Sequence, residues 1–304
     1  MRVTLLTLSV FACCAHAQEY PVKPIRIITS PVGGGNDFPA RLIAAGLSGT
    51  LGQQILVDNR PTVLIADMVA KSPPDGYTLL LTGSAHWLAP LLDKVNYDPL
   101  RDFAALTLVD RSPNVLVVHP SVPAKTVREF VALAKVRPGE LNVAVGGPGS
   151  SNDVAALLFG SLAHVQFTRV PYKGNAPAIT ALLSGEIQVM FSSSGAVAPH
   201  MQSGRLRALG IGSAKPSPLA PGVPPISSAV PGYLSEALHA MFAPARTPSA
   251  VVSRLNAAVG RYLRGAPARE IFLRTGIEPS PSTPEELIEI MSSEVARVSK
   301  VLKK

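Results

Sequence analysis

Residues 25–48 read IRIITSPVGGGNDFPARLIAAGLS, and this stretch decides how the rest of the chain is interpreted. Its first part, Ile25–Thr29, is rich in β-branched side chains and predicts a buried strand. The part from Asp37 to Ser48 has apolar residues at helical spacing and predicts a helix. Three consecutive glycines lie between the two, and glycine adopts backbone conformations that other residues resist. The stretch therefore predicts a strand, a tight loop and a helix in succession.

The same strand-and-helix alternation continues along the chain. Two helix starts are marked by capping boxes, in which Thr126 precedes Glu129 and Thr283 precedes Glu286. Such alternation predicts an α/β fold with largely parallel sheets. Further strands are expected at Gln54–Asp58, Tyr77–Thr82, Val115–His119, Leu141–Val145, Gln166–Val170, Ile187–Phe191 and Leu206–Ile211, and further helices at Val127–Val136, Asp153–Leu162, Ala176–Leu183, Ala250–Leu263 and Pro284–Leu302.

The composition excludes several classes of protein. Of the 304 residues 47% are hydrophobic and 16% charged, which is too apolar for a disordered chain. Beyond the N-terminus no apolar run reaches the roughly 20 residues that a membrane-spanning helix needs. The net charge of +8 is spread out except at Lys300, Lys303 and Lys304, so nucleic acid is not an expected partner. The histidines are scattered without a pair four residues apart, and neither a metal nor another cofactor is expected.

Residues 1–17 have the organisation of a secretory signal peptide. Arg2 gives a positive start, an apolar stretch follows, and Ala15-His16-Ala17 fits the cleavage pattern, so we expect cleavage after Ala17. The run that ends at Cys13 also loosely fits a lipidation box, and a lipid anchor there stays an alternative. Because the two cysteines are Cys13 and Cys14, the mature chain has no thiol for catalysis or for a disulfide.

Two proline-rich stretches predict that the chain crosses between two compact units. The first is His119–Pro123, and the second runs from Ser213 to Pro248. Two crossings build one lobe from both ends of the chain and the other from its middle, with a cleft between them. We therefore expect residues 18–122 and 238–304 to form the first lobe and residues 123–237 the second.

Two glycine-rich loops are candidates for binding an anion. Pro31–Asp37 and Gly146–Asn152 each join a predicted strand to a predicted helix, where free N–H groups and the helix dipole attract negative charge. Together they would hold a small carboxylate without Arg or Lys. The first loop fits neither the Walker nor the dinucleotide-binding pattern, and a turn without a ligand stays an alternative. Ser151 or Asn152 is expected to cap the helix that follows the second loop.

Enzyme chemistry is weakly supported. Ser150 and Ser151 lack the G-x-S-x-G elbow of serine hydrolases, and the carboxylates are dispersed. The loops Thr82–His86 and Ser192–Gly195 also follow strands, and ligands meet open α/β sheets at the carboxyl ends of strands. We therefore expect a binding protein rather than an enzyme, with a cleft hydrolase as the remaining alternative.

A series of short motifs then occurs in a specific order and spacing: Tyr20–Ile28, Pro31–Asp37, Ala40–Leu42, Leu51–Gln53, Asp58–Pro61, Asp75–Leu79, Tyr97–Pro99, Asp102–Phe103, Pro113–Val118, Val170–Gly174 and Gly204–Leu209. With these motifs the whole mature chain resembles the substrate-binding proteins of tripartite tricarboxylate transporters, the Bug (TctC-like) family. The resemblance implies a fold like that of type II periplasmic binding proteins, with two lobes of mixed, mainly parallel sheet, flanking helices and an interlobe cleft.

The resemblance also implies a function. Family members capture small carboxylates with backbone N–H groups, hydroxyls and water, so we expect a monomeric periplasmic receptor for an organic acid that serves membrane permease subunits. A ligand-sensing partner of a membrane sensor kinase is the alternative. By the resemblance, the ligand-binding residues are expected to be Pro31, Val32, Gly33, Gly34, Gly35, Asp37, Ser84, Ala85, His86, Gly149, Ser150, Ser151, Asn152, Tyr172, Phe191, Ser192 and Ser193.

The chain departs from the family pattern in three places. The first glycine loop is one residue shorter, and Thr62–Ile65 replaces a glycine-rich stretch after Pro61. Ser192 and Ser193 replace a common Asp-Asn pair. In the family Asp37 can meet a ligand amino group, but the loss of an acid at Ser192 favours a plain carboxylate over an amino acid.

Overall fold

The structure is a computed structural model that describes residues 20–32, 35–147 and 149–302. Within these ranges ten strands form one sheet in the order β2-β1-β3-β9-β4-β7-β5-β6, and β8 and β10 pair with β4 as well. The strands are β1 (Ile25–Thr29), β2 (Ile55–Asn59), β3 (Thr78–Gly83), β4 (Phe103–Val118), β5 (Asn142–Val145), β6 (Thr168–Pro171), β7 (Val189–Ser193), β8 (Arg207–Ile211), β9 (Glu236–Pro244) and β10 (Glu278–Pro279).

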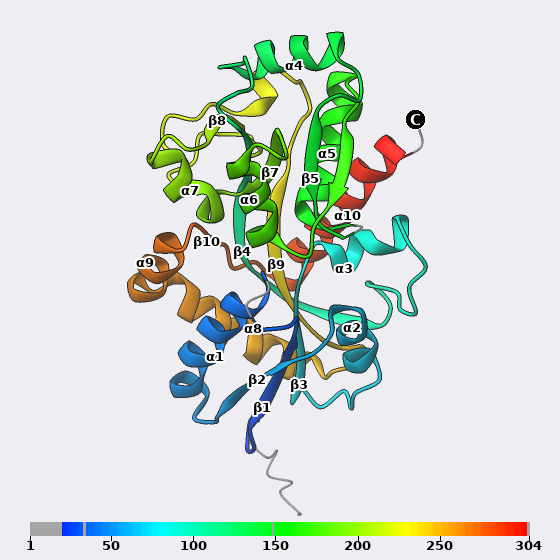
Figure 1. The fold of residues 1–304 in the computed structure, drawn as a ribbon. Coiled ribbons are helices and arrows are strands. Elements are labelled where there is room, and N and C mark those ends of the chain that lie inside the picture. The colour runs from blue at the N-terminus through cyan, green and yellow to red at the C-terminus, as the bar shows by residue number, and fades with distance from the viewer. Residues whose placement is uncertain (1–19, 33–34, 148, 303–304) are drawn as a thin grey trace, which may run out of the picture.

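Helices flank this sheet in both halves of the molecule (Figure 1). They are α1 (Asp37–Leu51), α2 (Thr62–Ala70), α3 (Ala85–Leu88), α4 (Val127–Val136), α5 (Ser151–Ala163), α6 (Asn175–Ser184), α7 (Ser194–Gln202), α8 (Ser249–Arg264), α9 (Ala266–Arg274) and α10 (Pro284–Leu302), with short 3₁₀ helices η1 (Ala89–Leu91) and η2 (Ile226–Ser228). Among the described residues, no helix combines the length and the apolar character that crossing a bilayer requires.

Strand β4 belongs to both lobes. Up to Pro113 it pairs antiparallel with β9, and from Asn114 it pairs antiparallel with β7 and, one residue later, with β8. Parallel pairing lies farther out, where β1 joins β2 and β3 in the first lobe and β5 joins β6 and β7 in the second. Figure 1 shows the long strand passing from one half into the other. The mixed α/β architecture is confirmed, but antiparallel pairing around β4 is more extensive than the sequence predicted.

Each lobe has a buried core of its own. In the first lobe Ile27, Ile43 and Val259 join β1, α1 and α8, and all three are fully buried. In the second lobe the rings of Phe159 and Phe191 pack against each other, and Tyr233 contacts both. Burying one such side chain contributes roughly 1.5–3 kcal/mol, so these contacts hold the short strands in place. Helix α10 connects the lobes because it contacts α3, β4 and α5.

Several elements were not predicted from the sequence. The first part of β4 was not expected, and β9 lies inside the stretch Ser213–Pro248, which was interpreted as a loose proline-rich crossing. The prolines of that stretch fall outside β9 except for Pro244 at its end, so the strand itself is uninterrupted. Helix α2 begins directly after Pro61, where the chain departs from the family pattern. In β4 the pairing changes between Pro113 and Asn114, before the expected crossing at His119–Pro123. The expected lobe boundaries stay predictions.

Candidate functional site

The first glycine loop is anchored by a buried carboxylate. Asp37, at the start of α1, accepts a hydrogen bond of 2.7 Å from the amide of Asn59, and it forms an ion pair of 3.1 Å with Arg41. The same Asn59 amide donates to the backbone oxygen of Ser30 over 2.7 Å. The carboxylate of Asp37 is therefore engaged within the protein, and it fixes the loop rather than standing ready for a ligand amino group.

The end of this loop lies against β3 and β9. A β-carbon placed on Gly35 would lie 3.9 Å from Nε2 of His239. A β-carbon on Gly83 would lie 3.3 Å from Oδ1 of Asn36 and 3.6 Å from Cδ2 of His239. Gly35, Pro31 and Val32 are exposed, whereas Gly33 and Gly34 lie outside the described residues. Gly35, at the described end of the loop, is thus exposed next to the ring of His239.

The second glycine loop is organised by Asn152. Its Oδ1 accepts hydrogen bonds from the backbone N–H of Gly146 over 3.1 Å and from the hydroxyl of Ser150 over 2.7 Å. The expected cap is wrong, because α5 begins at Ser151 and its N-cap is Ser150, whose side chain makes no capping bond. The backbone N–H of Gly149 donates to Asp153 over 3.3 Å. Ser150 and Ser151 are half-buried, so their hydroxyls lie at the edge of the solvent.

A row of buried polar side chains connects the two loops. Asp110, Ser112 and Asn114 occupy alternate positions of β4, and side chains two apart along a strand share a face. Asp110 bonds to His239, which lies under Gly35, over 2.7 Å. Asn114 donates to the hydroxyl of Ser151 at the start of α5 over 2.7 Å. The two loops therefore meet one face of β4, the first through His239 at position 110 and the second directly at position 114, and these positions lie about 13 Å apart along the strand at 3.3 Å per residue.

The middle of this row holds the start of α7. Ser112 and Ser194 lie 3.1 Å apart through their hydroxyl oxygens, and both donate to the backbone oxygen of Gly276. Ser193 is the half-buried N-cap of α7, whereas Ser192 is buried and its hydroxyl has no hydrogen-bond partner within the part of the chain that the structure describes. The expected Ser192–Ser193 turn is therefore next to the row, with Ser193 as its more accessible residue.

Three expected residues have side chains that the structure places elsewhere. Phe191 is fully buried in the core of the second lobe. His86 is packed among Tyr97, Phe103 and Phe242, and burial lowers its pKa to about 3, so it is a neutral core residue. The hydroxyl of Tyr172 donates to Glu186 over 3.2 Å. The ring of His86 cannot meet a ligand without leaving its core.

Two further expected segments make contact across the lobes. Gly149 of the second lobe, with φ of +76°, lies against η1, because a β-carbon there would be 3.6 Å from the backbone nitrogen of Ala89. Ser84 is buried ahead of α3, and Ala85 is half-buried at its first position. Ser84 lies beside Glu294 of α10, although the geometry of that pair falls short of a hydrogen bond. The loop after β3 therefore packs against both lobes.

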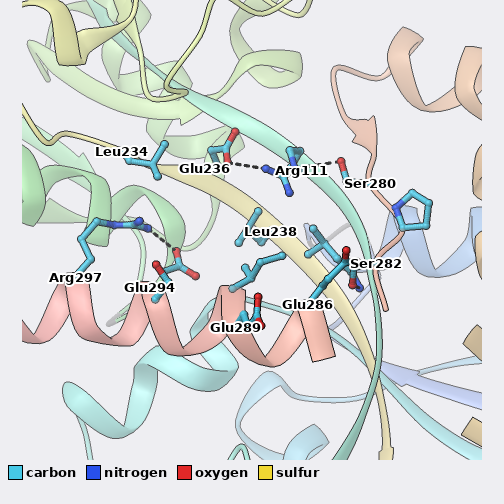
Figure 2. A pocket seen from close by; sticks show the side chains of 14 residues that line it. Arg111, Leu234, Glu236, Leu238, Ser280, Ser282, Glu286, Glu289, Glu294 and Arg297 are labelled. Carbon is cyan, nitrogen blue, oxygen red and sulfur yellow. Dashed lines mark hydrogen bonds and ion pairs between the residues drawn. The ribbon is translucent and has the colours of Figure 1, made fainter. Parts of the chain in front are cut away.

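A cavity among the described residues borders Arg111, which alternates along β4 with Asp110 and Ser112 and so lies on the opposite face of the strand (Figure 2). The cavity measures about 580 Å³ and lies between β4, β9 and α10. Arg111 pairs with Glu236 over 3.4 Å, and Arg297 pairs with Glu294 over 3.8 Å. Two more glutamates, Glu286 and Glu289, also line it, so carboxylates outnumber guanidinium groups there. This excess of negative charge repels the carboxylate of a ligand. The polar face of β4 is therefore the better candidate for an anion site.

The sequence interpretation missed the residues that join the site together. Asp110, Ser112 and Asn114 lie in the part of β4 that was not expected, and His239 was not among the expected site residues. There was little signal for them in the sequence, because Arg111 breaks the alternation of polar and apolar residues between 110 and 114 and Pro113 disfavours a strand. His239 gave no signal either, since its partner Asp110 is 129 residues away. In the described part of the chain no group of acidic, histidine or cysteine residues fits a metal ion.

Comparisons with known proteins show what the whole chain is similar to. Protein BugT of Bordetella pertussis is 33% identical over 300 residues, which cover 96% of this chain and 92% of that protein. The structure of Rpa4515 from R. palustris with adipate has a TM-score of 0.85 and 32% identity, covering 94% of this chain and 98% of that one. The structure of MatC from Rhodopseudomonas palustris with bound malate has a TM-score of 0.80 and 32% identity, covering 93% and 99%.

The family itself is shown by the sequence. A model described as the tripartite tricarboxylate transporter family receptor matches residues 39–304. This family and its solved neighbours are solute-binding receptors with a two-lobed fold. The chain belongs to the TctC family of tripartite tricarboxylate transporter receptors.

Proposed function

We propose that the protein is a periplasmic receptor that binds a small dicarboxylate between its lobes and delivers it to membrane permease subunits. The observation that carries this proposal is the polar face of β4. On that face Asn114 bonds to Ser151 at the end of the second glycine loop. Asp110 bonds to His239, whose ring lies next to Gly35 at the end of the first. A ligand between the loops contacts both lobes at once, which is how a ligand drives closure of a hinged receptor.

The chemistry of this site suits a carboxylate. The backbone N–H groups at the starts of α1, α5 and α7 have no partner within their helices, and helix dipoles favour negative charge at these ends. The half-buried Ser193 adds a hydroxyl donor, whereas the hydroxyl protons of Ser150 and Ser151 are engaged by Asn152 and Asn114. The guanidinium groups of Arg41 and Arg169 are paired with Asp37 and Asp153. Binding therefore depends on backbone and hydroxyl donors more than on basic side chains.

The neighbours support the ligand class. Rpa4515 was solved with adipate and MatC with malate, and both ligands are dicarboxylates. We carry the class over to this chain and not the individual compound. The replacement of an acidic residue by Ser192 in the expected turn fits a ligand without an amino group.

Calorimetry of the mature chain tests the proposal. The protein is unfolded, dialysed and refolded to remove any carried ligand, and is then titrated with adipate, malate, tricarboxylates, aromatic acids and amino acids. We expect at least one dicarboxylate to bind. Asn152→Ala, which removes the acceptor that orders the second loop, is expected to weaken binding about tenfold, or ~1.4 kcal/mol. Ser228→Ala, on the distant η2, is the matched control. No heat with any acid, from a protein that has refolded, contradicts the proposal.

A further inference from the structure

His239 and Asp110 form a buried pair beside the first glycine loop. Nδ1 of His239 lies 2.7 Å from Oδ1 of Asp110, and the side chain of His239 is 13% exposed while that of Asp110 is fully buried. The two residues face each other in the β4–β9 register. Because an ionised carboxylate only accepts hydrogen bonds, Nδ1 carries the proton that joins the pair.

The carboxylate of Asp110 lacks other compensation among the described residues. Its second oxygen, Oδ2, is buried and has no hydrogen-bond partner. A buried ionised group of this kind requires an opposite charge close by. Burial alone would lower the pKa of His239, but the negative charge and hydrogen bond of Asp110 outweigh this effect and hold the pKa above its ordinary value of 6.5.

The other ring nitrogen points toward the loop. A β-carbon on Gly35 would be 3.9 Å from Nε2, whereas a β-carbon on Gly83 meets Cδ2 on the neighbouring side of the ring. The backbone end of the first loop and the edge of the imidazole therefore border the same space. A ligand oxygen at the exposed backbone of Gly35 would also border Nε2.

The other charged groups around His239 are engaged elsewhere. Asp37, from α1, is bonded to Arg41 and Asn59. Glu236, on the same strand, and Arg111, on β4, lie on the opposite face and pair with each other. Asp110 is thus the charged group that bonds to His239, and Nε2 faces the site.

We propose, given the function above, that His239 is the residue that pairs with the ligand carboxylate and couples its binding to the uptake of one proton. In the neutral ring, with its proton on Nδ1, Nε2 carries a lone pair that repels a carboxylate. A proton taken from solvent binds Nε2, and the resulting N–H donates to a ligand oxygen as a charge-assisted hydrogen bond. Asp110 balances the new positive charge. The ligand class is therefore an anionic acid that binds more tightly as the pH falls.

Calorimetry in pairs of buffers with different ionisation enthalpies measures this proton directly. The probes are adipate and malate, and the wild-type protein is titrated between pH 5.5 and pH 8.5. We expect net proton uptake to rise with pH toward one proton per ligand at the basic end, where both carboxyl groups of the ligand are ionised. Above the pKa of His239, Kd is expected to rise about tenfold per pH unit.

Two variants separate a binding role from a structural one. His239→Gln keeps a polar side chain but has no titrating group, so we expect weaker binding, by about tenfold or more, and loss of the proton uptake. Asp110→Asn lowers the pKa of His239 and is expected to move the uptake curve to lower pH. His200→Gln, at an exposed histidine that bonds to Arg205, is the matched control and should behave like wild type.

The outcomes are distinct. Ligand binding without proton uptake in the wild-type protein, or unchanged uptake in His239→Gln, overturns the role of His239 and leaves the proposed function intact. If no acid binds the wild-type protein, the proposed function fails, and this inference fails with it. If His239→Gln does not fold, the uptake curves of wild type and Asp110→Asn decide the question.

Discussion

Asn114 of β4 and Ser151 of α5 bond to each other twice. The amide nitrogen of Asn114 donates to the hydroxyl of Ser151 over 2.7 Å, and that hydroxyl donates back to the amide oxygen over 3.0 Å. The same nitrogen donates to the hydroxyl of Ser235 over 2.8 Å. Since Asn114 is the first residue of β4 that pairs in the second lobe, this contact fixes the start of α5 to the strand that both lobes share.

Asn114→Ala is expected to destabilise the protein. The substitution leaves the buried hydroxyl of Ser235 and the half-buried hydroxyl of Ser151 without their partner, and the loss of a buried partner costs about 1–3 kcal/mol. Ser235→Ala removes one of these bonds and is expected to have a smaller effect. Urea denaturation, followed by circular dichroism, measures both. Equal stabilities of wild type and Asn114→Ala would show that the contact contributes nothing to the fold.

Asp37→Ala is expected to weaken ligand binding as well as stability. Without the carboxylate, Asn59 loses one of its two acceptors and the first loop loses its anchor to β2. We expect a loss of about 1–3 kcal/mol in unfolding free energy and a rise of Kd by tenfold or more, read by denaturation and calorimetry. Arg60→Ala, at an exposed residue that pairs with Asp58, is the control and is expected to change little. Unchanged affinity in Asp37→Ala would contradict the anchoring role.

His86→Phe is expected to reduce the loss of stability in acid. Burial lowers the pKa of His86 to about 3, below its ordinary value of 6.5. Because the pKa of His86 is lower in the folded protein, the unfolded chain binds this proton at a higher pH than the folded chain does. His86 therefore costs no stability above pH 6.5, and it destabilises the folded state progressively as the pH falls toward 3. The loss from this residue is up to about 1.4 kcal/mol per pH unit.

Thermal unfolding between pH 4 and pH 7.5 checks this prediction. Phe keeps the ring contacts with Tyr97 and Phe103 and removes the titrating group, so the melting temperature should fall less steeply in acid than in wild type. His119→Gln, at an exposed ring bonded to Ser121, is the control. Parallel curves for wild type and His86→Phe would mean that His86 is not the source of acid sensitivity.

Gly195→Ala is expected to disturb the contact between the lobes. Gly195 lies in the first turn of α7, and its backbone contacts the backbone of the segment that follows α9. A β-carbon on Gly195 would overlap the oxygen of Thr275 and lie 3.0 Å from Cα of Gly276. A backbone neighbour cannot rotate away, so we expect a loss of about 1–3 kcal/mol. Gly49→Ala, on α1 with open space around it, is expected to stabilise the protein by up to about 1 kcal/mol. Denaturation of the two variants side by side distinguishes a steric cause from the general effect of replacing glycine.

The helices and strands with a regular spacing of apolar residues were predicted correctly from the sequence. The expected helices Val127–Val136 and Pro284–Leu302 coincide with α4 and α10, and both begin at capping boxes whose side-chain bonds are present. The strand Ile25–Thr29 coincides with β1. Local spacing suffices in these places, since an apolar face and a cap determine the element without reference to distant residues.

The part of β4 that was not predicted depends on partners that are distant in the sequence. In β4, Asp110, Arg111 and Ser112 interrupt the apolar pattern, and they are tolerated there only because His239, Glu236 and Gly276 bond to them. The same partners create the polar face of the candidate site. The glycine loops were therefore predictable from the sequence, whereas the residues that bring them onto one face required the fold.

Pro113 stands at the point where β4 changes its pairing from one lobe to the other. Its ring locks φ near −65°, and it also restricts the backbone of Ser112 before it. Rotation of one lobe against the other must then be absorbed by the few remaining torsions of this strand and of its neighbour β9. We expect the path between open and closed receptor to be narrow and reproducible, with its axis determined by the covalent chain before any solute arrives.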